Sequence, residues 1–191
     1  MIDRRKLLVG GVATAALTPI SPASAQNDGA TSACVWPPPA WKNVGFPSHR
    51  WVNILFVHTS ERFKDRYFWD GTYSMDAVKR FSWTVRDFRQ NEFHWIDPRL
   101  MDLLFILHWR YCKDEIRIFS GYRTPQTNAN LEGAAKNSQH MEGRALDIHL
   151  PNMDNDEVAR SFEGILKGGV GMYPGKEFTH LDLGNMRRWV G

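Results

Sequence analysis

The sequence predicts an α+β fold, with helices packed on one face of an antiparallel sheet. The first observation is the length of 191 residues, which suits one domain. The second is a set of short segments in which apolar and polar side chains alternate, as in strands. The third is a set of longer segments with apolar residues at helical spacing. Hydrophobic residues make up 42% and charged residues 24%, which excludes a disordered chain or a coiled coil as the overall description.

The first twenty-five residues have the features of an export signal. A positive start containing Arg4 and Arg5 precedes a short apolar run over residues 7–17 and a small-residue cleavage site at residues 23–25. The arginine pair and the leucines after it resemble a twin-arginine signal, and an ordinary secretory signal is the alternative. The apolar run is short for a membrane span. We therefore expect residues 1–25 to be removed on export to the periplasm.

Charge argues against nucleic-acid and membrane partners for the exported chain. Removing Asp3 together with three basic residues lowers the net charge from +3 to +1. No basic run exceeds three residues, so the charge pattern gives no nucleic-acid footprint. The chain has two cysteines, Cys34 and Cys112, for which an oxidising compartment permits a disulfide without requiring one. The oligomeric state has no signature in the sequence.

The N-terminal part of the exported chain predicts a linker, a hairpin and a helix. Residues 26–50 contain three consecutive prolines, which favour an extended linker or strap. Residues 51–58 and 61–69 are rich in β-formers, and the Asp-Gly pair after them signals a turn. Apolar residues at helical spacing predict a helix over residues 75–89.

A second helix and a strand follow. Asp97 and Pro98 form a helix start, because the acidic side chain caps the N-terminus and proline suits the first turn. Leucines at i, i+3, i+4 and i+7 give this helix one apolar stripe, and we expect it to end near Cys112. Residues 116–119 predict a short strand, and residues 120–125 a loop.

The C-terminal part predicts three strands and one helix. Residues 144–150 alternate, with Asp147 on the face opposite the leucines. Residues 154–166 have helical periodicity, and residues 170–173 and 178–183 predict two closing strands. We assign residues 51–191 to one domain.

Three residues stand where a catalytic zinc site requires them. Zinc binds histidine nitrogen and carboxylate oxygen, and a catalytic site keeps three protein ligands and an open position for water. His140 precedes Asp147 by seven residues, and His180 lies in another predicted strand. If the two strands are neighbours, Asp147 and His180 can point to the same side. The alternative for each histidine is an ordinary packed or surface residue.

Three blocks of sequence resemble a known family. Residues 120–128 read SGYRTPQTN, residues 137–150 read NSQHMEGRALDIHL, and residues 168–189 read GGVGMYPGKEFTHLDLGNMRRW. In this order they resemble the YcbK-like branch of the zinc D-alanyl-D-alanine peptidases, which shares a fold core with the hedgehog signalling domain. The resemblance covers roughly residues 51–190.

The resemblance implies roles for the matching residues. His140, Asp147 and His180 match the three ligands of one zinc ion per chain. Arg123 matches an arginine that binds substrate beside the metal and stabilises the developing oxyanion; the alternative is a structural salt bridge. Ser138 matches a serine that contacts the substrate peptide, and a local turn hydrogen bond is its alternative.

Two carboxylates compete for the role of general base. Glu177 precedes His180 by three residues, the offset of the catalytic glutamate in the related dipeptidases. Residues i and i−3 of a straight strand face opposite ways, so Glu177 requires a bend. Asp182 shares a face with His180 and is the rival base, or else a partner that orients the histidine.

The resemblance implies an exported zinc metallopeptidase that hydrolyses amide bonds in peptidoglycan stem peptides, as a DD-carboxypeptidase or endopeptidase. The residues themselves indicate only metal-assisted amide hydrolysis. The main alternative is a zinc-containing cell-wall binding protein without catalysis, because a fold does not oblige a reaction. A peptidase acting on proteins is a further alternative.

Overall fold

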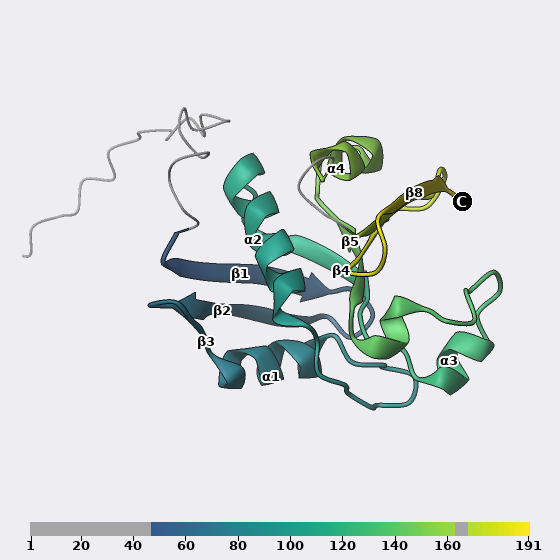
Figure 1. The fold of residues 1–191 in the computed structure, drawn as a ribbon, viewed down its shortest axis with the longest axis horizontal. Coiled ribbons are helices and arrows are strands. Elements are labelled where there is room, and N and C mark those ends of the chain that lie inside the picture. The colour runs from purple at the N-terminus through teal and green to yellow at the C-terminus, as the bar shows by residue number, and fades with distance from the viewer. Residues whose placement is uncertain (1–46, 163–167) are drawn as a thin grey trace, which may run out of the picture. The chain divides into compact units, whose positions relative to one another are not determined.

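A computed structural model of the chain describes residues 47–162 and 168–191 (Figure 1). The expected signal over residues 1–25 lies outside the described residues, as do Cys34 and most of the expected linker over residues 26–50. Export therefore stays a prediction, and a disulfide between the cysteines stays one of two alternatives. No helix in the described ranges has the length and apolar character to cross a bilayer.

The described residues fold around one eight-stranded sheet with the order β3-β2-β1-β4-β5-β7-β6-β8. Its strands are β1 (His49–Phe56), β2 (Glu61–Trp69), β3 (Thr72–Tyr73), β4 (Ile116–Ser120), β5 (Ala145–His149), β6 (Gly169–Met172), β7 (Thr179–Asp182) and β8 (Arg187–Val190). The α+β class is confirmed. The sheet is mixed rather than purely antiparallel, because β1 pairs with β4 and β6 pairs with β8 in parallel.

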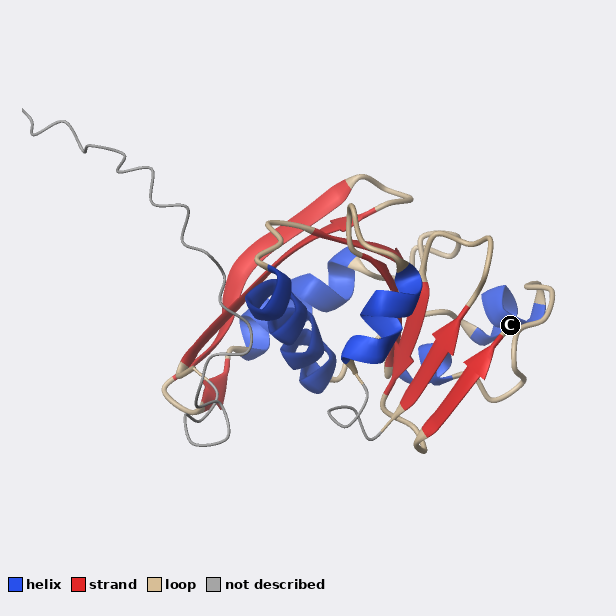
Figure 2. Ribbon diagram, turned by 90° about the horizontal axis from the view of Figure 1, so that it is seen from above, coloured by secondary structure: helices blue, strands red, loops and turns tan. Residues whose placement is uncertain are grey.

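Within residues 47–162 and 168–191, four α-helices and one short 3-10 helix accompany the sheet. They are α1 (Met75–Thr84), α2 (Pro98–Tyr111), α3 (Pro125–Ala129), η1 (Gln139–Glu142) and α4 (Asn155–Ser161). In Figure 2 the strands bend around the central helices. The helix expected over residues 154–166 is shorter than predicted, since α4 ends at Ser161, and residues 163–167 lie outside the described residues.

The N-terminal hairpin forms as predicted. β1 and β2 pair antiparallel from Phe56 and Glu61 to His49 and Trp69. Asp70 and Gly71 both adopt a positive φ, 49° and 81°, and this turn leads into the short β3.

Helix α1 starts at the predicted residue and ends earlier than the periodicity suggests. The Ser74 side chain caps it by accepting a hydrogen bond from the backbone N–H of Ala77. The helix stops at Thr84 because the Val85 carbonyl accepts a hydrogen bond from Tyr122 instead of continuing the helical ladder. Gly121 lies against Val85 so closely that a Cβ would be 2.3 Å from the Val85 carbonyl oxygen. This contact joins α1 to the loop after β4.

Helix α2 confirms the predicted start. The Asp97 side chain accepts a hydrogen bond from the backbone N–H of Arg99, and Pro98 occupies the first turn. The helix ends at Tyr111, with Cys112 as a left-handed C-cap. On α2, Asp102 accepts hydrogen bonds from Tyr67 (2.8 Å) and Tyr73 (2.5 Å), which ties the helix to β2 and β3.

The two faces of the central strands differ in composition. Ile148 on β5 pairs with Ile118 on β4, and these side chains join the buried apolar cluster that also contains residues of α1, α2 and α4. Asp147 alternates with Ile148 and therefore points to the opposite face. Core and candidate site thus share strands but occupy opposite faces.

Candidate metal centre

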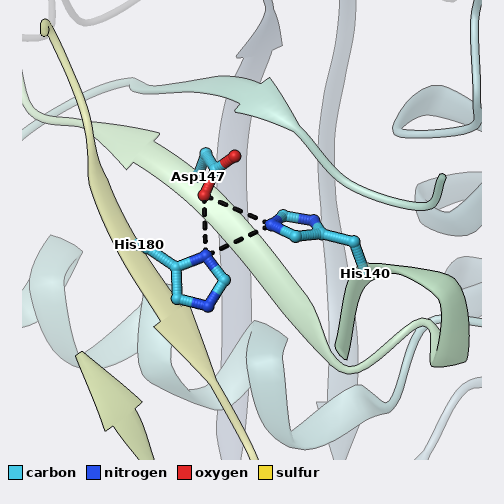
Figure 3. Close-up of side chains that lie close together, drawn as sticks. All are labelled: His140, Asp147 and His180. Carbon is cyan, nitrogen blue, oxygen red and sulfur yellow. Dashed lines mark hydrogen bonds and ion pairs between the residues drawn. The ribbon is translucent and has the colours of Figure 1, made fainter. Parts of the chain in front are cut away.

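The three residues with metal-ligand character come together from separate elements. Asp147 on β5 lies directly opposite His180 on β7 in the antiparallel register. His140 reaches the same point from η1 (Figure 3). All three side chains are buried, with His180 the most exposed at 8%.

The spacing of the donor atoms suits one tetrahedral metal ion. Oδ1 of Asp147 lies 2.8 Å from Nδ1 of His180 and 3.3 Å from Nε2 of His140, and the two nitrogens are 3.2 Å apart. Zinc bonds of about 2.0–2.1 Å in a tetrahedron place neighbouring ligand atoms about 3.3 Å apart. The donor set of two imidazoles and one carboxylate therefore fits zinc and leaves a fourth position for another ligand.

The protonation of His140 is fixed by a backbone carbonyl. Its Nδ1 lies 2.7 Å from the Gly121 oxygen and must donate to it, because a carbonyl accepts only. The neutral ring then presents an unprotonated Nε2 to the centre. Burial lowers the pKa of His140, which favours this neutral form.

Asp182 contacts the edge of the His180 ring that faces away from Asp147 and His140. Nε2 of His180 lies 2.9 Å from Oδ2 of Asp182, which leaves Nδ1 facing the centre. Asp182 also accepts hydrogen bonds from Arg187 (2.8 Å) and from the backbone N–H of Gly184 (2.7 Å), and it is fully buried. Burial acts to lower the pKa of His180, but Asp147 and Asp182 outweigh it, so the pKa is raised. A carboxylate enclosed in this way orients an imidazole, and Asp182 is not among the residues that line the cavity.

Arg123 lies beside the cluster. Its Nη2 donates to Oδ2 of Asp147 at 2.5 Å and its Nε donates to Ser120 at 2.8 Å. Burial acts to raise the pKa of Asp147, but His140 and His180 outweigh it, so the carboxylate is ionised with a pKa well below its usual range. The salt bridge considered as an alternative for Arg123 is thus present, and the residue also lines the cavity in front of the cluster.

Ser138 lines the cavity in front of the cluster, whereas Glu177 does not. The Ser138 side chain accepts a hydrogen bond from the His140 backbone N–H at 3.3 Å, so the turn contact exists, and the residue also lines the cavity. Glu177 is exposed in the turn between β6 and β7 and is not among the cavity-lining residues, although its neighbours Lys176 and Phe178 are. The structure therefore does not bring Glu177 to the cluster.

An aromatic wall completes the cavity of about 460 Å³, and it was not among the predicted site residues. The ring centroids of Trp189 and His180 lie 5.3 Å apart, and Nε1 of Trp189 donates to the Tyr173 hydroxyl at 3.2 Å. A Cβ on Gly171 would lie 2.5 Å from the Trp189 indole, so this strand position requires glycine. The interior glycine in a strand was the one signal in the sequence for this close approach.

Comparison with known proteins identifies the family of the chain. A peptidase M15 family model described as "Peptidoglycan L,D-endopeptidase MepK" matches residues 46–189. The Escherichia coli K12 protein named peptidoglycan L,D-endopeptidase MepK is 31% identical over 193 residues, covering 98% of this chain and 97% of the relative. A Haemophilus influenzae protein named probable peptidoglycan L,D-endopeptidase MepK is 32% identical over 154 residues, covering 78% and 83%. The chain therefore belongs to the MepK family of M15 peptidases.

Proposed function

We propose that this protein is an exported zinc endopeptidase that hydrolyses cross-links between peptidoglycan stem peptides. The observation that carries the proposal is the buried His140–Asp147–His180 cluster, which offers three zinc ligands at the base of a cavity. Structural zinc sites use four protein ligands, whereas a three-ligand set is typical of catalysis. The names of the relatives favour cleavage at an L,D linkage, rather than the DD linkage expected from the sequence.

His140, Asp147 and His180 would hold the ion. A bound zinc ion supplies Lewis-acid chemistry and lowers the pKa of a coordinated water molecule. Among the described residues, the Arg123 side chain donates to Asp147 and Ser120, and its other N–H groups can donate to a substrate carbonyl oxygen. A fixed guanidinium at this place stabilises the negative charge that develops on that oxygen during amide hydrolysis.

The two carboxylates considered as general base, Asp182 and Glu177, are not assigned that role in this proposal. Asp182 acts on His180 as a positioning residue, because both of its oxygens are engaged in the protein interior. Glu177 lies outside the cavity lining and is not assigned a catalytic role.

Export to the periplasm is part of the proposal. A substrate in the cell wall requires the chain to leave the cytoplasm, and residues 1–25 carry the features of a signal with a twin-arginine pair. Fusion of residues 1–25 to a reporter, with and without Arg4→Lys and Arg5→Lys, tests the route.

The activity is tested by zinc analysis and muropeptide digestion together. We expect about one zinc per purified chain and new products from cross-linked muropeptides, whose masses identify the cleaved bond. The Asp147→Ala variant is expected to lack both. Zinc without products from any muropeptide would favour the non-catalytic binding protein, and the absence of zinc would refute the ligand assignment.

A further inference from the structure

The cavity in front of the metal centre carries more positive than negative charge. Arg89, Arg123, Lys176 and Arg187 line it. Two of these are already engaged by carboxylates of the protein, because Arg123 pairs with Asp147 and Arg187 pairs with the buried Asp182. Among the described residues, no ion pair involves Arg89 or Lys176.

The backbone of Arg89 is fixed by a hydrogen bond to the Asp87 side chain. The buried Asp87 accepts a hydrogen bond from the Arg89 N–H (3.0 Å) through one oxygen and from Thr124 N–H (2.9 Å) and hydroxyl (2.8 Å) through the other. These contacts fix Arg89 to the loop that follows Arg123. The guanidinium rests on the Phe88 ring at 4.4 Å, which orients it while leaving its N–H groups to other partners.

Lys176 is held at another wall of the cavity. Its N–H donates to the Tyr173 carbonyl (3.0 Å), and its own carbonyl accepts from the Asn155 side chain (2.8 Å). The ammonium lies 5.4 Å from the centre of the Tyr173 ring. It belongs to the turn between β6 and β7, whereas Arg89 is fixed to the loop after β4. In the sheet, β4 and β6 lie on opposite sides of the β5–β7 pair that carries the metal centre.

We propose that Arg89 and Lys176 bind carboxylates of the substrate on the two sides of the scissile amide, so that the protein selects acidic peptides. This inference rests on the proposed function and adds the charge of the substrate to it. Two cations at separate walls suit a peptide with a free carboxylate on each side of the cleaved bond, since each contact pairs opposite charges. Glu132 is the one acidic lining residue outside the metal centre, and it repels such a peptide.

The test measures binding separately from hydrolysis. Stem-peptide dimers whose cross-linking amide is replaced by a non-hydrolysable bond, with their side-chain carboxylates either free or amidated, are titrated into the zinc-loaded full chain by calorimetry. We expect the free form to bind about tenfold or more tightly than the amidated form, and this preference to shrink at high salt. Arg89→Gln and Lys176→Gln are each expected to reduce the preference about three- to tenfold.

Two variants serve as matched controls. Lys64→Gln removes a cation from β2, outside the cavity lining, and is expected to keep the preference. Glu132→Gln removes the opposite charge at the cavity and is expected to keep or increase it. Unchanged thermal midpoints establish that each variant is folded.

Each outcome bears on one proposal. Equal affinity for the free and amidated peptides, no binding of either, or a preference that survives both Arg89→Gln and Lys176→Gln would overturn the inference. Hydrolysis of cross-linked muropeptides is measured on the same samples. A clear preference without any hydrolysis would leave the inference standing and reject the peptidase.

Discussion

Replacing Asp182 with asparagine tests whether this residue positions a metal ligand. The carboxylate accepts hydrogen bonds from His180 (2.9 Å), from Arg187 (2.8 and 3.3 Å), and from the N–H groups of Gly184 (2.7 Å) and Gly169 (3.2 Å). Asparagine offers one oxygen and one NH2 group in the same space. Its NH2 group must therefore face at least one of these donors.

The magnitude follows from these contacts. A buried donor left without an acceptor costs about 1–3 kcal/mol. The ion pair with the half-exposed Arg187 contributes about 0–1 kcal/mol. We therefore expect the free energy of unfolding to fall by roughly 1–4 kcal/mol. Loss of the partner that orients a metal-bound histidine lowers metal affinity about 10- to 100-fold, which we expect for zinc at His180.

The assay is a zinc competition titration with a chelator of known affinity, alongside urea unfolding of the same samples. Asp76→Asn is the control, because this residue on α1 is exposed and its one ion pair among the described residues is with Arg80, across one helical turn. It is expected to change the unfolding free energy by about 0.5 kcal/mol or less and zinc affinity not at all. Unchanged zinc affinity in Asp182→Asn would refute the positioning argument. If hydrolysis were nevertheless lost, Asp182 would be the general base.

Three further perturbations follow from the structure. Asp102→Ala removes the acceptor of the buried Tyr67 hydroxyl, and we expect the unfolding free energy in urea to fall by about 2–4 kcal/mol, with Asp102→Glu falling less. Burial lowers the pKa of His108 below 6.5, so its contribution to stability is complete above pH 6.5 and is lost as the pH falls through the folded-state pKa. The wild type should therefore lose more unfolding free energy than His108→Gln between pH 7.5 and 5, and equal losses would contradict this. Gly171→Ala places a Cβ 2.5 Å from the Trp189 indole, so the indole must move. We expect a shifted tryptophan fluorescence spectrum and weaker muropeptide binding, and an unchanged spectrum would contradict the close contact.

Local signals in the sequence predicted the elements they govern. The Asp97–Pro98 start of α2 and the Asp70–Gly71 turn depend on neighbours in the chain, and both appear as expected. The alternation around Asp147 likewise sets its face of the sheet without reference to distant residues.

Features that depend on distant residues were not predictable in the same way. The parallel pairing of β1 with β4 joins segments about sixty residues apart, and no local pattern encodes it. The strands β3 and β8 were not predicted; β3 has only two residues, too few to show an alternation. Helix α1 ends at Thr84 because Tyr122, far along the chain, takes the Val85 carbonyl.

The candidate site shows the same division. The spacing and the family resemblance selected His140, Asp147 and His180, which the fold brings within contact of one another. They did not decide between Glu177 and Asp182, because that choice depends on the turn after β6 and on the enclosure of Asp182 by Arg187. Glu177 stands at the expected offset but remains exposed to solvent.

Because side chains alternate between the two faces of β5, substitutions at neighbouring positions of this five-residue strand have different effects. Substitutions at Leu146 and Ile148 alter how firmly the domain holds together, whereas those at Asp147 alter what it can bind. A library that varies the residues of the cavity face while keeping these two apolar residues would change specificity without a matching penalty in folding. Related proteins can thus keep the apolar face of β5 while residues on its cavity face change, so that a different bond of the substrate is cleaved.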